Sequence, residues 1–268
     1  MRNSASPILA IDIGNSLIHV GLVDARARRC LRRFDPPLSA IRDRLPRVLD
    51  KAVLLGTKAN SSVLRAVIAG GGKGMVLWIR ALLREFDVTD VTDLAWHAGL
   101  PVRFRYKHPS RLGADRIADA LYTAAAYPKR NAIIIDVGTA VTVDALTGNG
   151  DFIGGVIFPG PATQLQALHE AAPALPMVDL IKKTTALPGA STEECMRSGV
   201  VHSVAGGLDH LVRKFHEVLG GRCTVLSTGG GWNTVKGYVD FKSIEVADMT
   251  LIGTGLYFDG KSPGSLKG

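Results

Sequence analysis

ILAIDIGN at residues 8–15 returns as IIIDVGTA at residues 133–140, and this repetition carries most of the information about the fold. In each copy an apolar strand ends in an aspartate, an apolar residue, a glycine and a small polar residue, and a second apolar run follows. The two aspartates, Asp12 and Asp136, lie 124 residues apart in a chain of 268. Because internal repetition is typical of duplicated folds, the pattern predicts two related halves that each begin with the same strand-turn-strand unit.

Strand and helix patterns alternate along the rest of the chain, which predicts an α/β protein. We place the two halves at residues 1–116 and 117–268, with a boundary in the region from Ser110 to Tyr127. We expect a turn at Gly154-Gly155 and a flexible glycine turn at residues 70–74. The apolar spacing predicts helices over residues 38–53, 76–86, 114–126, 162–171, 192–204 and 206–219, and strands over residues 8–23, 101–104, 133–146 and 223–226.

The composition is that of a globular protein with a sizeable core, because 46% of the residues are hydrophobic and 21% are charged. Lys and Arg outnumber Asp and Glu by 32 to 24, but aromatic residues do not interleave with the basic segment 26–51, which argues against a nucleic-acid stacking surface. The three cysteines form no CxxC pair, and the seven histidines show no metal-binding spacing. With neither a signal peptide nor a spanning segment in the pattern, we expect a cytoplasmic protein that does not act at a membrane.

Two aspartate-glycine turns and a later glycine run suit a nucleotide triphosphate. The first turn holds Asp12 and Gly14-Asn15-Ser16, the second holds Asp136 and Gly138-Thr139, and the glycine run is Gly229–Gly231. Glycine lets backbone N–H groups approach phosphates closely, and a carboxylate can hold hydrated Mg²⁺. Aspartate-glycine turns also occur in ordinary hairpins, but two matched copies and a third glycine turn together favour nucleotide binding.

Other nucleotide-binding motifs are absent from the sequence. Gly72-Lys73-Gly74 lacks both the hydroxyl residue after lysine and the earlier glycine of a P-loop. No GxGxxG follows a strand, so a Rossmann dinucleotide site is excluded as well.

A second candidate site is Gly113-Ala114-Asp115-Arg116, at the beginning of the alanine-rich helix pattern. A carboxylate in the first helical turn is stabilised as the anion, and there it can accept the proton of a substrate hydroxyl. Arg116 can hold a substrate carboxylate through two hydrogen bonds. An aspartate in the first turn also favours a helix without any catalytic role, and this second interpretation stays open.

These motifs occur together and in an order that resembles the type III pantothenate kinases, over residues 8–258. The segments that carry the resemblance are Asp12–Ser16, Gly113–Arg116, Asp136–Asp144, Gly154–Gly160, Leu175-Pro176, Thr192 with Ser198-Gly199, Thr228–Gly230 and Ala247–Leu251.

The resemblance implies a kinase of the actin/hexokinase/acetate-kinase fold, with two RNase H-like halves and the nucleotide in the cleft between them. It implies that ATP phosphorylates the primary hydroxyl of pantothenate to 4'-phosphopantothenate, the first step of coenzyme A biosynthesis, in a homodimer that uses Mg²⁺ and K⁺ or NH₄⁺. It assigns proton acceptance to Asp115 and the monovalent cation to Asp136. The residues implied for ATP are Asp12, Ile13, Gly14, Asn15, Ser16, Leu17, Ile18, His19 and Thr139. The residues implied for pantothenate are Tyr106, Gly113, Ala114, Asp115, Arg116 and Thr192.

Three positions depart from the family's usual pattern: Ser16 replaces a threonine, His19 stands where lysine is common, and Gly189–Thr192 lacks a basic residue. Two other functions stay open from the sequence. One is a regulatory module on the same fold that binds nucleic acid or another protein through the Arg-rich segment 26–47. The other is a related kinase or phosphohydrolase with a different small acceptor.

Overall fold

The computed structural model describes residues 7–59, 64–180 and 186–259. The chain forms two compact units. The first unit contains residues 1–128, 150–152 and 248–268, and the second contains residues 129–149 and 153–247. Neither unit is one continuous stretch of chain, because the end of the chain returns to the first unit. The sequence-based division at residues 116 and 117 describes related halves, and it stays a prediction.

The first unit is built on a five-stranded sheet in the order β3-β2-β1-β4-β5. The strands are β1 (Ile8–Ile13), β2 (Ile18–Asp24), β3 (Arg29–Phe34), β4 (Arg65–Gly70) and β5 (Asp90–Asp93). β1 pairs antiparallel with β2 and parallel with β4, which itself is parallel to β5. The apolar runs of β1 and β4 are buried because both strands lie inside the sheet.

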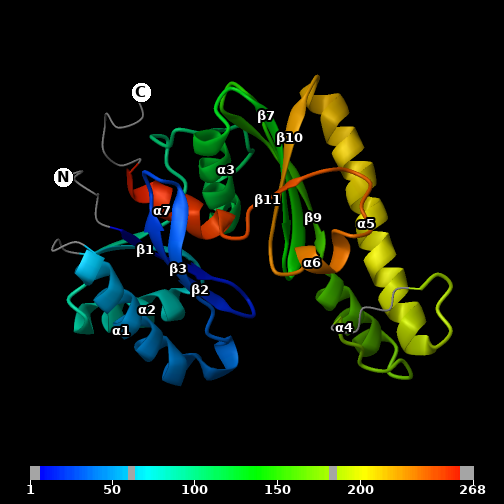
Figure 1. The fold of residues 1–268 in the computed structure, drawn as a ribbon, viewed down its shortest axis with the longest axis horizontal. Coiled ribbons are helices and arrows are strands. Elements are labelled where there is room, and N and C mark those ends of the chain that lie inside the picture. Colours follow the sequence, from blue (N-terminus) through cyan, green and yellow to red (C-terminus); the bar gives the residue numbers. More distant parts are fainter. Residues whose placement is uncertain (1–6, 60–63, 181–185, 260–268) are drawn as a thin grey trace. The chain divides into compact units, whose positions relative to one another are not determined.

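Helices cover both faces of this sheet (Figure 1). α1 (Ile41–Ala59) and α2 (Lys73–Glu85) lie on one face, and α3 (Ala114–Ala126) and α7 (Met249–Asp259) lie on the other. The core under α1 and α2 contains Leu9, Ile11, Leu45 and Ile79, which are fully buried. α7 lies very close to α3 and to β2. Glycine permits this approach, because a side chain at Gly253 would overlap Ala118 and one at Gly255 would overlap Val23. Two short 3₁₀ turns, Leu38–Ala40 and Pro109–Arg111, precede α1 and α3.

The second unit carries most of a six-stranded sheet in the order β11-β10-β7-β8-β9-β6. Its strands are β7 (Asn131–Val137), β8 (Ala140–Leu146), β9 (Asp151–Pro159), β10 (Cys223–Thr228) and β11 (Ile244–Glu245), and its helices are α4 (Pro161–Ala171), α5 (Thr192–Leu219) and α6 (Trp232–Val235). α5 covers one face of the sheet, where Val204 and Leu208 pack against Ile133 and Val143 (Figure 1). β6 (Arg103–Phe104) belongs to the first unit and pairs with the first two residues of β9, which belong to that unit too.

The two sheets have the same strand order, β3-β2-β1-β4-β5 in one and β9-β8-β7-β10-β11 in the other. In both, the opening hairpin is antiparallel and the fourth strand is parallel to the first. The prediction of two related halves that begin with the same hairpin is therefore confirmed, and the chain has the actin/hexokinase type of fold.

Two local predictions from the sequence were wrong, and one strand was missed. Residues 192–204 and 206–219 form one helix, α5, because the 28-residue helix continues through Gly206 and Gly207. Gly154-Gly155 lies inside β9 rather than at a turn, and a side chain at Gly155 would overlap Asp144 and Val143 of β8. Part of the Arg-rich segment forms the edge strand β3, which we did not predict.

No helix within residues 7–59, 64–180 and 186–259 is long and apolar enough to cross a membrane. The cytoplasmic location stays a prediction.

Candidate active site

The turn between β1 and β2 exposes the polar residues that the sequence singled out. Asp12 lies near the end of β1 and pairs in register with His19 of β2. The backbone N–H of Gly14 donates to the carbonyl of Leu17 over 3.1 Å, which closes a tight turn around the exposed Asn15 and Ser16. A side chain at position 14 would come within 3.0 Å of that carbonyl, so the turn favours glycine. The result is an exposed turn with backbone and side-chain donors, next to a carboxylate.

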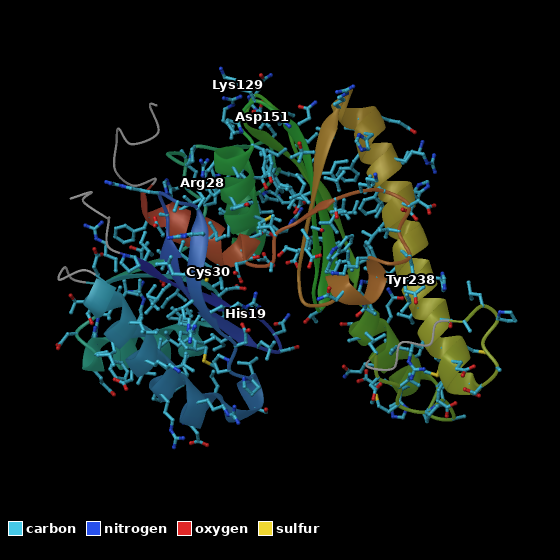
Figure 2. The ribbon with its side chains drawn as sticks, viewed as in Figure 1. His19, Arg28, Cys30, Lys129, Asp151 and Tyr238 are labelled. Atoms are coloured by element: carbon cyan, nitrogen blue, oxygen red, sulfur yellow. The ribbon has the colours of Figure 1, made fainter. Side chains whose placement is uncertain are left out.

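His19, which is labelled in Figure 2, is held by a charged network in the first unit. Its Nδ1 donates to Oδ1 of Asp35 over 2.6 Å, and the same oxygen accepts from Nε of Arg33 over 2.7 Å. Arg33 also donates to Asp248, immediately before α7, over 3.0 Å. Burial would raise the pKa of the Asp35 carboxyl, but the hydrogen bonds from Arg33 and His19 outweigh it and lower that pKa. The charge of Asp35 therefore persists, and the imidazole is fixed in orientation.

The second hairpin turn, in the second unit, brings Asp136 next to the glycine run. Gly229 has a φ of +94°, and a side chain there would overlap both Oδ1 of Asp136 and the carbonyl of Val137. The N–H of Gly231 donates to the same carbonyl over 2.8 Å. The carboxylate of Asp136 therefore lies directly against the Gly229–Gly231 turn. This close approach is possible because Gly229 has no side chain.

Thr139 lies exposed in this turn, and its backbone is fixed from α4. Its carbonyl accepts from the N–H of Gly160 over 2.9 Å and from the hydroxyl of Thr163 over 2.7 Å. Gly160 is itself so close to Gly138 that a side chain would overlap the Gly138 carbonyl. The turn is thus pre-organised, which a phosphate-binding turn requires.

Metal binding here would use few protein ligands. Within the described part of the chain, His, Cys, Asp and Glu form no cluster of three or more that could hold a metal ion. Mg²⁺ commonly binds through one or two carboxylates together with substrate phosphates and water, so the donor set fits that ion but not a metal caged by protein alone.

Asp115 lies in the first turn of α3, where its carboxylate bends back over the end of the helix. Oδ1 accepts from the backbone N–H of Arg116 over 2.7 Å. Gly113 is the N-cap, and a side chain on it would overlap the same oxygen. Asp115 therefore presents a fixed and partly exposed carboxylate at the first turn of α3.

Arg116 is buried, with 5% of its surface exposed, and its guanidinium lies over two aromatic rings. Its central carbon is 5.6 Å from the ring centre of Tyr106 and 5.5 Å from that of Phe152. The structure therefore brings Tyr106 into contact with Arg116 of the Gly113–Arg116 motif. Phe152 was missed, because one phenylalanine before a Gly-Gly pair carries no signal of its contacts.

Thr192 is the first residue of α5 in the second unit, and it is exposed. Two side chains fix the start of the helix: the hydroxyl of Ser191, the N-cap, accepts from the N–H of Glu194 over 3.2 Å, and the carboxylate of Glu194 accepts from the N–H of Ala190 over 2.8 Å. Thr192 is therefore held on a well-defined helix end, next to the segment that lacks the family's usual basic residue.

Part of the Arg-rich segment has a structural explanation. Arg28, with a φ of +50°, donates to the carbonyl of Ala125 in the last turn of α3 (Figure 2). A cation at this end of a helix is favourable, because the free carbonyls there carry partial negative charge.

Comparison with known proteins now adds to this geometry. Residues 8–214 match the model of the type III pantothenate kinase family. The type III pantothenate kinase of Saccharopolyspora erythraea is 33% identical, over 94% of this chain and 98% of its own length.

Two solved structures share the fold alone. One is a Campylobacter jejuni protein described as a Baf family transcriptional activator (TM-score 0.56, 19% identity, 94% of this chain and 98% of that one). The other is the activator of 2-hydroxyisocaproyl-CoA dehydratase from Clostridium difficile with bound ADPNP (TM-score 0.54, 13% identity, 96% of both chains). The family match and the relative together show that this chain belongs to the type III pantothenate kinase family.

Proposed function

We propose that this chain transfers the γ-phosphoryl group of ATP to the primary hydroxyl of pantothenate, which yields 4'-phosphopantothenate and ADP in the first step of coenzyme A biosynthesis. The observation that carries the proposal is the fixed carboxylate of Asp115 beside the buried Arg116, on a chain of this family. One group can accept a hydroxyl proton and the other can bind a carboxylate, and pantothenate offers both partners.

The turn Asp12–His19 and Thr139 bind the phosphates of ATP in this proposal. Their rigid backbone turns offer N–H groups and hydroxyls that need no rearrangement when the substrate arrives. Mg²⁺ bound with ATP would neutralise phosphate charge, and Asp12 is the carboxylate of the first turn that would help to hold it. K⁺ or NH₄⁺ would bind at Asp136, whose carboxylate faces the glycine turn.

Asp115 accepts the proton of the substrate hydroxyl while the hydroxyl oxygen forms the new bond to the γ-phosphorus. The bond between that phosphorus and the bridging oxygen breaks, and ADP leaves. Because phosphoryl transfer depends mainly on positioning and charge stabilisation, the protein's main contribution is to hold the two substrates in line. Arg116 and Tyr106, with Gly113, Ala114 and Thr192, bind pantothenate, and Arg116 pairs with its carboxylate.

We also propose that the active form is a homodimer. The second unit carries a groove of about 520 Å³ between α4 and α5, lined mostly by apolar side chains such as Pro159, Leu168, Met196 and Val200. Ile157 on β9 is 59% exposed, and Leu168 is 39% exposed. A second copy of the chain would cover this apolar surface, and light scattering of the purified protein measures its mass directly.

The test is an ADP-release assay with ATP, Mg²⁺ and pantothenate in either K⁺ or Na⁺ buffer. We expect turnover that depends on pantothenate and is faster in K⁺. The variant Asp115→Ala should lower kcat by about 10²–10⁴. Near-normal turnover in that variant would refute the role of Asp115, and equal rates in Na⁺ would refute the cation site.

Absence of turnover from a folded protein would refute pantothenate as the acceptor. The family match does not favour the alternative of a regulatory module that binds nucleic acid or another protein.

A further inference from the structure

Three aromatic side chains form a cluster against Arg116: Phe104, Tyr106 and Phe152. We call them the aromatic cluster. The ring centres of Phe104 and Phe152 are 5.3 Å apart, and those of Tyr106 and Phe152 are 6.4 Å apart with an edge-to-face arrangement. Phe152 is the centre of the cluster, because it contacts both other rings and the guanidinium.

Phe152 is fully buried, and its backbone is fixed. Its carbonyl accepts from the N–H of Arg105 over 2.8 Å. The preceding residue, Asp151, accepts two hydrogen bonds from Arg103 and one from Arg105, each at 2.9–3.0 Å (Figure 2). The Phe152 ring is therefore a rigid surface rather than a mobile cover.

A buried guanidinium loses hydration, and the negative faces of aromatic rings compensate in part for that loss. Both rings lie within 6 Å of the central carbon of Arg116, the range in which this attraction is significant. Because the N–H bonds of arginine lie in the guanidinium plane, contact with ring faces leaves them oriented for bidentate hydrogen bonds. Of the two rings over Arg116, Tyr106 is 36% exposed and Phe152 is buried, so Phe152 supplies the permanent contact.

We propose that Phe152 is a positioning residue for substrate binding: it holds the guanidinium of Arg116 in the orientation that pairs with the acceptor's carboxylate. This inference rests on the proposed function, because it takes pantothenate as the ligand of Arg116. Phe152 does not touch the reacting atoms, so its effect belongs to the affinity for the acceptor and not to the chemical step.

The experiment compares Phe152→Leu with the matched control Phe104→Leu. Both variants remove one ring from the aromatic cluster, but of the two substituted rings it is that of Phe152 that lies under the guanidinium. We expect Phe152→Leu to raise KM for pantothenate about tenfold, since a desolvated cation–π contact is of that size, with kcat and KM for ATP nearly unchanged. Phe104→Leu should leave KM for pantothenate within about twofold of wild type.

The double variant Phe152→Leu with Arg116→Leu provides the decisive control. If Phe152 acts through Arg116, its substitution adds no further rise in KM once Arg116 is absent. Should Phe152→Leu fail to fold, Phe152→Met, which has similar volume and no ring, is measured with the same expectation. An unchanged KM, an equal rise in the Phe104 control, or a loss confined to kcat would overturn the inference. Failure of the wild type to use pantothenate would instead refute the proposed function.

Discussion

A methyl group added at Gly113 tests the role of Asp115 without removing its carboxylate. The backbone at Gly113 has a φ of −57°, which alanine adopts without strain. The three nearest atoms to the added methyl all belong to Asp115: Oδ1 would overlap it, whereas Cγ is 3.5 Å and Oδ2 is 3.9 Å away. Gly113→Ala therefore conflicts with the carboxylate and with little else.

To reach an ordinary contact of 3.4 Å, Oδ1 has to move by about 1 Å. That movement breaks or lengthens its 2.7 Å hydrogen bond from the N–H of Arg116. Because a misplacement of about 1 Å can cost a factor of about 10² in rate, we expect kcat to fall by about 10–100-fold. Alanine is also a poorer N-cap than glycine, by up to about 1 kcal/mol, which corresponds to a fall in Tm of about 2–4 °C.

Gly72→Ala separates these two effects. Gly72 is the N-cap of α2, with a φ of −75° and no heavy atom within 4 Å of an added methyl. Its substitution should change Tm by a similar amount and leave kcat unchanged in the ADP-release assay. In an Asp115→Ala background, Gly113→Ala should add nothing to the loss of rate. A folded Gly113→Ala enzyme with wild-type kcat would show that the carboxylate position does not matter, and the role of Asp115 would be refuted.

Three further predictions follow from the structure. Gly229→Ala forces a residue with a φ of +94° against Asp136, so we expect a lower Tm by calorimetry and a higher K⁺ requirement in the assay; an unchanged K⁺ requirement would contradict the Asp136 site. Hydrogen bonds from Arg103 and Arg105 lower the pKa of Asp151 from 3.8 to about 2. The stability they supply is present above pH 3.8 and lost as pH falls toward 2, so Asp151→Asn should lower Tm at pH 7 and approach wild type between pH 4 and 2; a constant difference would refute this. Gly207→Ala removes a glycine from the interior of α5 where no heavy atom lies within 4 Å, and Tm should rise by about 2–4 °C; a fall would mean that another chain covers this face.

The repeated hairpin could be predicted because each copy combines an apolar run, a carboxylate and a glycine in a fixed order. The continuity of α5 could not, because Gly206 and Gly207 locally disfavour a helix by about 1 kcal/mol each. Tertiary packing overrides that preference: Val204, Leu208 and Val212 recur at intervals of four residues and are buried against the sheet. Local propensity is visible in a sequence, but the surface that the helix covers is not.

The same distinction holds for the candidate site. Asp115 and Arg116 were found because they are adjacent and begin a helix pattern. Gly113 belongs to the same motif, but its close approach to the Asp115 carboxylate is visible only in the structure. Phe152, which contacts Arg116, has no sequence pattern of its own. Likewise His19 was named from the family resemblance. Asp35, which accepts from it, and Arg33, which holds Asp35, lie 16 and 14 residues further on and had no signal in the sequence.

Equivalent glycines in the two related sheets show which features the fold requires and which belong to the candidate site. Gly70 is the last residue of β4 and Gly229 directly follows β10, at matching ends of equivalent strands, and both have positive φ. At Gly70 the nearest atom to an added side chain is the carbonyl oxygen of Ile13, at 2.9 Å, and the other near atoms belong to Ile13 too. At Gly229 the corresponding carbonyl of Val137 is joined by the carboxylate of Asp136. In both copies the positive φ and the nearby backbone carbonyl require a glycine at this position. The recurrence of the glycine alone is therefore weak evidence for a ligand. The carboxylate contact is found at Gly229 and not at Gly70. This difference agrees with the proposal, implied by the family resemblance, that the monovalent cation binds at Asp136.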